Sequence, residues 1–257
     1  MPGLLWPDQA IGVFETMLVL DGSPIELDPH LRRLGASVRE LFGAELPSGT
    51  RELVLERTAP LSVGRLRLTV APRDDGSLGT AAVTAKVDPE DLFPSWERAM
   101  ALRPFVIPGG LGEHKWADRD GLAWTEASEA KGALPLVLDS GEEVLEASRA
   151  NVFAVEDGVL VTPAADGRIL PGVARARAIE TARSLGVEVR EERLDVERMI
   201  AAGEAFLTGS VRGIEPVSAV GETLLGPTGE LLAELTSEMR RSWMGTGTGS
   251  SSSVRAR

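Results

Sequence analysis

Lysine is rare in this chain, and one lysine stands where it could do chemistry. Of the 27 basic residues, three are lysines, at positions 86, 115 and 131, and the rest are arginines. Arginine stays protonated and cannot form an imine, whereas a lysine with a lowered pKa can attack a carbonyl group. Residue type alone leaves open that Lys115 is a surface residue, the reading that fits Lys86 and Lys131. The position favours chemistry, because a Pro-Gly-Gly-Leu-Gly loop at 108–112 precedes Lys115 and we expect an amphipathic helix over 116–131.

The composition excludes several classes of site. The chain has no cysteine, which excludes disulfides, thiolate metal sites and a cysteine nucleophile. Two histidines, His30 and His114, argue against a multi-histidine metal centre, so we expect no metal. We expect both histidines to be structural, and Trp116 to fill the core. There is no tyrosine to act as a general base.

Charge and hydropathy narrow the partners to small molecules. The net charge is −12, and no basic run is interleaved with aromatic residues, so we expect no nucleic-acid partner. No apolar stretch is long enough to span a bilayer, so we expect no membrane partner. The first residues lack a basic region followed by an apolar run, which argues against a signal peptide. These features predict a soluble, cytoplasmic protein.

Hydrophobic periodicity predicts a mixed α/β chain with two domains. Strands are expected at 12–20, 24–27, 65–72, 80–86, 99–106, 134–139, 143–147, 151–155, 158–162, 187–192, 204–208 and 213–219, and helices at 28–42, 48–57, 116–131, 173–185, 195–201 and 228–242. Asp28 is expected to cap the first of these helices and Gly43 to end it. We read the glycine loop as a connector and place the domain boundary there. This gives an N-terminal α/β domain at 1–108, a second domain with a barrel-like sheet at 109–243, and a disordered Gly/Ser-rich tail at 244–257.

Six short motifs follow one another along the chain. They are Gly12-Val13-Phe14-Glu15-Thr16, His30-Leu31-Arg32-Arg33-Leu34, Lys115 with Arg119, Glu146 to Phe153, Ile169-Leu170-Pro171-Gly172-Val173, and Leu207-Thr208-Gly209-Ser210-Val211. In this order and spacing the chain resembles the class IV aminotransferases, the pyridoxal-phosphate enzymes of fold type IV. The resemblance covers nearly all of the chain and implies a D-amino-acid aminotransferase-like architecture, pyridoxal 5′-phosphate as cofactor, a small-molecule amino substrate and a homodimer.

The resemblance also assigns roles to individual residues. Lys115 looks like the lysine that holds the cofactor aldehyde, and Glu146 like the carboxylate that keeps the pyridine nitrogen protonated. Arg33 matches the arginine that binds the phosphate, a task that suits its planar fork of donors. Arg32 should face elsewhere, because neighbours on a helix do not share a face. The remaining phosphate contacts would come from the amides of Val173 and Ala174, at a helix N-terminus, and from the Ser210 hydroxyl.

The fold does not determine which reaction an enzyme catalyses, so the reaction has to be inferred from the residues of the site. The first motif, the Lys115 segment and Ser210 to Val217 resemble the branch of the family formed by the aminodeoxychorismate lyases. In that branch a threonine takes part in proton transfer, and Thr16 occupies the matching place. Arg103 and Arg212 could bind substrate carboxylates or could be surface charges. Glu215 departs from the lyase pattern, which more often has a basic residue there.

Other activities stay open on the sequence. An amino-acid transaminase of the branched-chain or D-amino-acid type is the main alternative, although the absence of tyrosine argues against the branched-chain type. A cofactor-binding protein without turnover is a further alternative, against which the presence of Lys115, Glu146 and Arg33 argues. A nucleotide-binding α/β domain would rest on the glycine loop alone.

Overall fold

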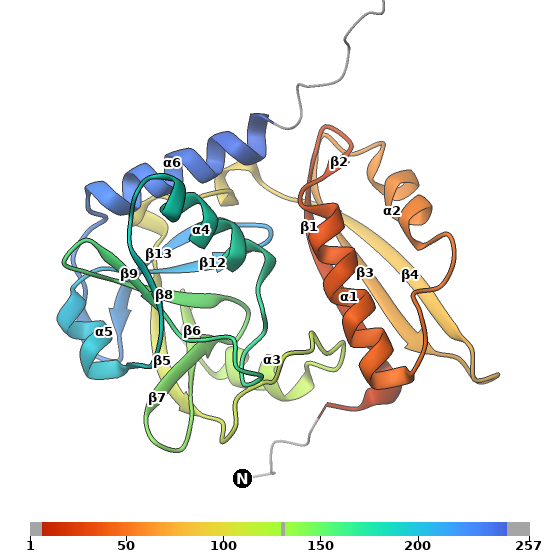
Figure 1. Cartoon of the computed structure of the whole chain (residues 1–257), viewed down its shortest axis with the longest axis horizontal. Coiled ribbons are helices and arrows are strands. Elements are labelled where there is room, and N and C mark those ends of the chain that lie inside the picture. The colour runs from red at the N-terminus through yellow and green to blue at the C-terminus, as the bar shows by residue number, and fades with distance from the viewer. Residues whose placement is uncertain (1–6, 130–131, 246–257) are drawn as a thin grey trace, which may run out of the picture.

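The polypeptide folds into two β-sheets, each covered by helices. The computed structural model describes residues 7–129 and 132–245, so that Lys131 and residues 246–257 of the expected tail lie outside it. One sheet has four strands and the other has ten. Figure 1 shows the two sheets side by side, with β1 of the smaller sheet facing the larger one. The expected mixed α/β class is confirmed.

The smaller sheet comes from the first third of the chain. Its strands run in the order β2 (Ser23–Pro24), β1 (Val13–Leu20), β3 (Val63–Pro72) and β4 (Leu78–Lys86), all antiparallel. Helices α1 (Leu27–Phe42) and α2 (Thr50–Thr58) pack their apolar residues on one face of this sheet. Helix α1 begins one residue before the expected cap, Asp28. Its cap is Glu26, in the left-handed conformation, and Gly43 ends the helix as expected.

The larger sheet contains the remaining strands. Their order is β10 (Val189–Glu191), β9 (Val159–Thr162), β8 (Asn151–Glu156), β12 (Ala205–Gly209), β13 (Gly213–Val220), β5 (Met100–Val106), β6 (Ala133–Leu138), β7 (Glu143–Ala147) and β11 (Leu194–Asp195), with β14 (Thr223–Leu224) paired to β13. Its helices are α3 (Asp120–Ser128), α4 (Val173–Ser184), α5 (Val196–Ala202) and α6 (Glu230–Gly245). Short 3₁₀ turns lie at Gln9–Ile11, Pro89–Asp91 and Trp96–Arg98. In the described ranges, no helix has both the length and the apolar character that crossing a membrane would need.

Strand β1 joins the two hydrophobic cores, because its two faces pack against different elements. Met17 and Val19 belong to the core under α1, whereas Leu18 and Leu20 belong to a core shared with α4 and α6 of the larger unit. Alternate residues of a strand point to opposite faces, so a strand buried on both sides reads as a continuous hydrophobic run. Thr16 is the one residue of β1 that is not buried. The strand therefore presents this hydroxyl at a gap between the two cores.

Two boundaries differ from those expected from the sequence. Strand β5 pairs in parallel with β6 and β13, so it belongs to the larger sheet rather than to the N-terminal unit. We propose that the domain boundary lies before β5, in residues 87–99, rather than at residue 108. At the other end, Met244 and Gly245 continue α6 instead of starting the tail.

Candidate active site

A pocket of about 1280 Å³ opens between the two sheets, and most of the expected site residues line it. They are Lys115, Thr16, Arg33, Glu146, Val173, Ala174, Ser210 and Arg212. These residues come from β1, α1, the segment before α3, β7, the start of α4 and the turn after β12. The fold therefore brings together groups that lie up to about 200 residues apart in the sequence.

The backbone around Lys115 is held by β1. The amide of Phe14 donates to the Lys115 carbonyl at 2.8 Å, and the amide of Ala117 donates to the Gly12 carbonyl at 2.9 Å. Trp116 pairs with Val13 between these bonds. Because this pairing uses an extended backbone, the helix expected from residue 116 begins only at Asp120.

The surroundings of the Lys115 amine favour its neutral form more than water does. Burial lowers the pKa of Lys115 to about 8, and the positive charge of Arg33 adds to this, against the opposite effect of Glu15. The amine lies 4.9 Å from the centre of the Phe14 ring. A primary amine with this pKa is partly unprotonated near neutral pH, which makes it a competent nucleophile.

Glu146 is buried on β7 and has few polar contacts. The Leu170 amide donates to its two oxygens at 3.2 and 3.4 Å, and the Asn151 side-chain amide lies 3.4 Å from Oε2. Burial raises the pKa of Glu146 to about 8, although the Leu170 amide and the charge of Lys115 act in the opposite direction. Such a carboxyl group can share or take up a proton at neutral pH, as a partner for a basic ring nitrogen must.

Arg33 is fixed by a carboxylate to which the sequence analysis gave no role. Its Nε and Nη2 each donate to Glu15 at 2.7 Å, and its Nη1 donates to the Pro171 carbonyl at 2.9 Å. His30, also buried, contacts Glu15 at 2.7 Å. Burial opposes the ionisation of Glu15, but Arg33 and His30 together hold its pKa at about 2. The signal for Glu15 was present in the sequence, as a lone carboxylate in an apolar strand.

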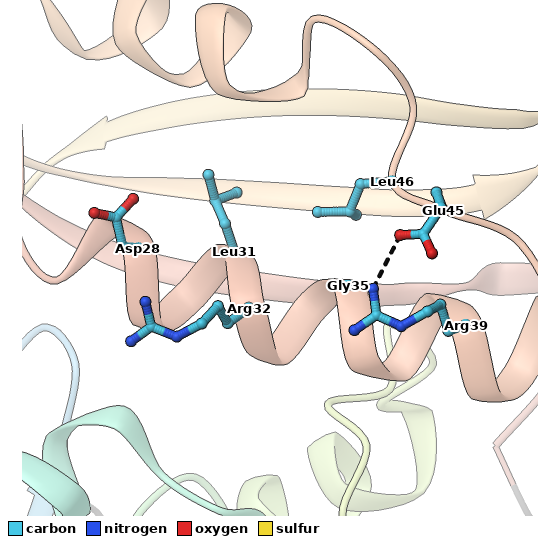
Figure 2. Close-up of a pocket in the computed structure, with 7 residues that line it drawn as sticks. All are labelled: Asp28, Leu31, Arg32, Gly35, Arg39, Glu45 and Leu46. Carbon is cyan, nitrogen blue, oxygen red and sulfur yellow. Dashed lines mark hydrogen bonds and ion pairs between the residues drawn. The ribbon is translucent and has the colours of Figure 1, made fainter.

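Arg32 points away from the pocket, as its helical position predicts. It lines a separate groove along α1 together with Leu31, Gly35 and Leu46. Figure 2 shows Arg32 and Arg39 along this face of α1, with Arg39 paired to Glu45. The two neighbouring arginines of the second motif thus serve different surfaces.

The start of α4 fits a phosphate group. Its cap residue is Gly172, which offers no side chain to the first amides of the helix, including those of Val173 and Ala174. Free amides and the helix dipole attract anions at such a position. A Cβ atom on Gly172 would lie 2.0 Å from Oδ1 of Asn151, so the close approach needs glycine. Arg33 reaches the same turn through Pro171.

Two hydroxyl groups complete this end of the pocket. Ser210 lies just after β12, and its carbonyl accepts from the amide of Leu18 at 3.2 Å, which ties the turn to β1. The Thr208 hydroxyl is buried and has no hydrogen-bond partner among the residues that the structure describes. A buried, unpaired hydroxyl in a lined cavity is satisfied when a polar ligand binds. The donor set therefore fits a phosphorylated ligand.

The wall formed by β1 and β3 carries two arginines that the sequence analysis did not identify as site residues. Thr16 pairs with Arg67 across β1 and β3, and Leu18 pairs with Arg65, so the two arginines share the face of Thr16. All of these but Leu18 line the pocket. The guanidinium of Arg67 lies 3.8 Å from the centre of the Phe14 ring. The alternation Arg-Leu-Arg-Leu at 65–68 was the available signal, because it places two charges on one strand face.

The two arginines expected to bind substrate are placed differently. Arg212 lines the pocket, where it donates to Glu215 at 2.7 Å and to Asp91 at 3.2 Å. Arg103 is not among the lining residues: it lies on β5, donates to the Gly221 carbonyl at 2.6 Å and pairs with Glu222. The expectation for Arg103 fails because β5 belongs to the larger sheet and directs this side chain toward the turn at 221–222.

The glycine loop at 108–112 is a wall of the pocket rather than a free connector. The amide of Gly110 donates to the Ile107 carbonyl, and the amide of Gly112 donates to the Arg168 carbonyl. A Cβ atom on Gly110 would lie 2.2 Å from the Arg168 carbonyl oxygen. His114 follows the loop, contacts Ser37 of α1 at 3.1 Å and also lines the pocket. The loop is therefore packed between the Lys115 segment and the Arg168 turn.

Comparison with known proteins agrees with this site. The family model described as "Amino-transferase class IV" matches residues 12–220. The crystal structure of 4-amino-4-deoxychorismate lyase from Pseudomonas aeruginosa superposes with a TM-score of 0.79 and 27% sequence identity, and covers 91% of each chain. The branched-chain-amino-acid aminotransferase of Escherichia coli is 34% identical over 155 residues, which are 58% of this chain and 48% of the relative. The chain thus spans about half the length of the curated relatives it matches.

A third neighbour is described as a hypothetical aminotransferase from Mycobacterium tuberculosis in its PLP-bound form. It has a TM-score of 0.80 at 20% identity and covers 96% of this chain and 95% of its own, which shows the shared fold. The family match spans most of the chain, and the pocket offers an amine, a buried acid and an anion cradle in one place. The chain belongs to the class IV aminotransferases, fold type IV enzymes whose cofactor is pyridoxal 5′-phosphate.

Proposed function

We propose that this enzyme is a lyase that converts 4-amino-4-deoxychorismate into 4-aminobenzoate and pyruvate, a step toward folate. The observation that supports it best is the place of Thr16, the only residue of β1 that is not buried, on the pocket wall with Lys115. A hydroxyl in the same pocket as the reactive amine suits an elimination that needs a second proton carrier. The 27% identity to the lyase structure over 91% of each chain supports the same reaction.

Six residues would hold the cofactor. The Lys115 amine would bind its aldehyde, and Glu146 would hold a proton at its ring nitrogen. Its phosphate would lie against Arg33, the Val173 and Ala174 amides and the Ser210 hydroxyl. When bound, pyridoxal 5′-phosphate supplies an aldehyde that bonds reversibly to an amine and a ring that accepts the electron pair of a broken C–H bond.

Lys115 and Thr16 would move the protons. The free Lys115 amine would take the proton from the ring carbon that carries the substrate nitrogen. The C–O bond to the side chain would then break, and pyruvate would leave as its enolate. Lys115 or the Thr16 hydroxyl returns a proton to the methylene carbon, which gives pyruvate. The remaining ring becomes aromatic, which drives the elimination, and no atoms are gained or lost overall.

Arginines would bind the two carboxylates of this substrate. Arg67 and Arg65 lie on the Thr16 face of the small sheet, and Arg212 lines the pocket from the larger unit, near Glu215. A guanidinium pairs well with a carboxylate because its donors form a planar fork. Arg103 is left out of this set, because it lies outside the pocket.

The alternative activity is amino transfer by an amino-acid transaminase, which the 34% identity to branched-chain aminotransferases favours. A transaminase needs a keto acid to turn over, and the lyase does not. The test is to add 4-amino-4-deoxychorismate to the holoenzyme without any keto acid and to measure pyruvate and 4-aminobenzoate. We expect both products in equal amounts. Turnover only with an amino acid plus a keto acid would make the enzyme a transaminase.

Two properties of the enzyme in the cell are proposed with this function. We expect a homodimer, which sedimentation at several protein concentrations would test. We expect the enzyme to work in the cytoplasm, where the lyase would supply a folate precursor.

A further inference from the structure

Glu15 is a buried carboxylate that does not line the pocket. Its side chain is 1% exposed, and the neighbouring Phe14 and Thr16 both face the pocket. Alternate residues of a strand point to opposite sides, so Glu15 points toward α1. It therefore cannot touch a substrate, and its effect on the reaction must pass through another residue.

Both oxygens of Glu15 are used by groups on α1. Oε1 accepts from Nε of Arg33, and Oε2 accepts from Nη2 of Arg33, each at 2.7 Å. Oε2 also contacts Nδ1 of His30 at 2.7 Å. His30 and Arg33 are three residues apart on one helix, and this spacing places them on the same face. The carboxylate is thus held by the His30 and Arg33 side chains, and it fixes the position of the Arg33 guanidinium in turn.

These contacts determine which donors Arg33 has left. A guanidinium carries five N–H groups. Glu15 takes two of them, and the Pro171 carbonyl takes a third, on Nη1. One N–H remains on each terminal nitrogen, at the end of a side chain that lines the pocket. Two parallel donors on one guanidinium match two oxygens of a phosphate.

Without Glu15 this arrangement would not persist. Arg33 has 10% side-chain exposure, so its unpaired N–H groups would turn toward other acceptors. A long arginine side chain also has many rotamers, and fixing one of them before the ligand binds removes an entropic cost of binding. The burial of Glu15 makes it a rigid anchor, because its strand packs in the core under α1.

We propose that Glu15 is a positioning residue that holds Arg33 as a two-pronged donor, and that it makes the site select phosphorylated pyridoxal over pyridoxal. This rests on the proposed role of Arg33 at the phosphate. Glu15 would act on the phosphate end alone. The carbonyl end of the ligand would still depend on Lys115.

The test compares the affinities of the apoprotein for pyridoxal 5′-phosphate and for pyridoxal, measured from the absorbance of the bound chromophore. Glu15→Gln keeps the size of the side chain but loses the charge and one acceptor. We expect the preference for the phosphorylated form to fall about 10- to 100-fold in this variant, the loss of a charge-assisted hydrogen bond. Any change in the reactivity of Lys115 would affect both ligands alike and cancel in the ratio.

Two further variants separate the possible failures. Asp28→Asn, on the same helix as Arg33, breaks an exposed ion pair with Arg51 of α2 and should leave the ratio unchanged. Arg33→Ala should abolish the preference. If it does not, the proposed phosphate site is wrong. If Arg33→Ala abolishes the preference but Glu15→Gln leaves it intact, or lowers both affinities equally, the positioning role of Glu15 is overturned.

Discussion

At the scale of single residues, the pocket shifts the pKa values of an amine and a carboxyl group toward neutral pH. Burial moves the pKa of Lys115 down and the pKa of Glu146 up, so that both are about 8. Neither group is therefore locked in one protonation state at neutral pH. A site that must bond to an aldehyde at one end and protonate a ring nitrogen at the other needs this condition.

Lys115 should carry the cofactor. Borohydride reduction of the holoenzyme should fix the label on the peptide that contains Lys115. The variant Lys115→Ala should lose the visible absorbance band, because the amine that forms the bond is gone. Lys86→Ala, at the rim of the same pocket, is the matched control and should keep the band. A label on Lys86 would contradict the assignment.

Cofactor capture should depend on pH through the Lys115 amine. Only the neutral amine attacks an aldehyde, and with a pKa of about 8 its fraction rises as pH approaches 8 and then levels off. We expect the rate constant for binding of pyridoxal 5′-phosphate to rise about tenfold from pH 6 to pH 7 and to reach a plateau above pH 8 to 9. Stopped-flow absorbance measures this. A simple alkylamine in place of the protein should show a rate that still rises at pH 10.

Thr16 should matter for turnover and not for cofactor binding. Thr16→Val keeps the shape of the side chain and removes the hydroxyl that would carry a proton. We expect kcat to fall by about 10²- to 10⁴-fold while the cofactor spectrum stays the same. Thr16→Ser keeps a hydroxyl and should retain most of the activity. Normal turnover by the valine variant would remove Thr16 from the mechanism.

At the scale of elements, the site depends on backbone segments that approach one another closely. Strand β1 holds the Lys115 segment, and the loop 108–112 packs against the carbonyl of Arg168. Arg168 pairs with Asp139, Glu143 and Asp166, so one side chain ties the turns behind the loop together. Backbone amides of the loop donate to Asp139 and to the Arg168 carbonyl, so the pocket wall is tied to the turns behind it.

Two adjacent glycines test this close packing. Gly109 and Gly110 both have left-handed backbone, but a Cβ atom on Gly109 would meet nothing within 4 Å, whereas one on Gly110 would lie 2.2 Å from the Arg168 carbonyl oxygen. Gly109→Ala should lower the free energy of unfolding by about 1 to 2 kcal/mol, the cost of the left-handed conformation. Gly110→Ala should cost about 1 to 3 kcal/mol more, because the added carbon overpacks the loop. Denaturant melts of both variants give the difference, and equal costs would mean that the loop is free to move.

At the scale of the whole molecule, the pocket spans the two sheets. Arg33 and Thr16 belong to the smaller unit, whereas Glu146, Val173 and Ser210 belong to the larger one. The cores are already continuous through β1, which packs on both sides. A ligand that contacts both units should therefore stabilise them as one body.

Removal of the cofactor should lower the stability of both units together. At a free concentration of about 100 times Kd, a ligand that binds only the native state adds about 2.7 kcal/mol. We expect calorimetry to show a higher Tm with pyridoxal 5′-phosphate and a single transition. Free phosphate at the same concentration is the control and should give a much smaller shift. Two transitions, of which the cofactor moves one, would show that the ligand contacts one unit alone.

Local patterns in the sequence were sufficient for the mixed α/β class and most element positions, and the resemblance to a family named most of the expected residues that line the pocket. Strand alternation, helix periodicity and the Gly43 cap depend on neighbours within a few residues, so they can be read without the fold. The family motifs pointed to the cofactor for a similar reason, because each motif is short and continuous.

Only the tertiary structure could decide which distant groups meet. The helix expected from residue 116 starts later because β1 pairs with the Lys115 segment. Arg103 faces a remote turn because β5 joins the larger sheet. Glu15 of β1 accepts hydrogen bonds from Arg33 of α1. Arg67 of β3 lies beside Thr16 of β1. Each of these outcomes depends on contacts between residues far apart in the chain. Such contacts form only when strands pair and helices pack against them, and no local preference encodes them.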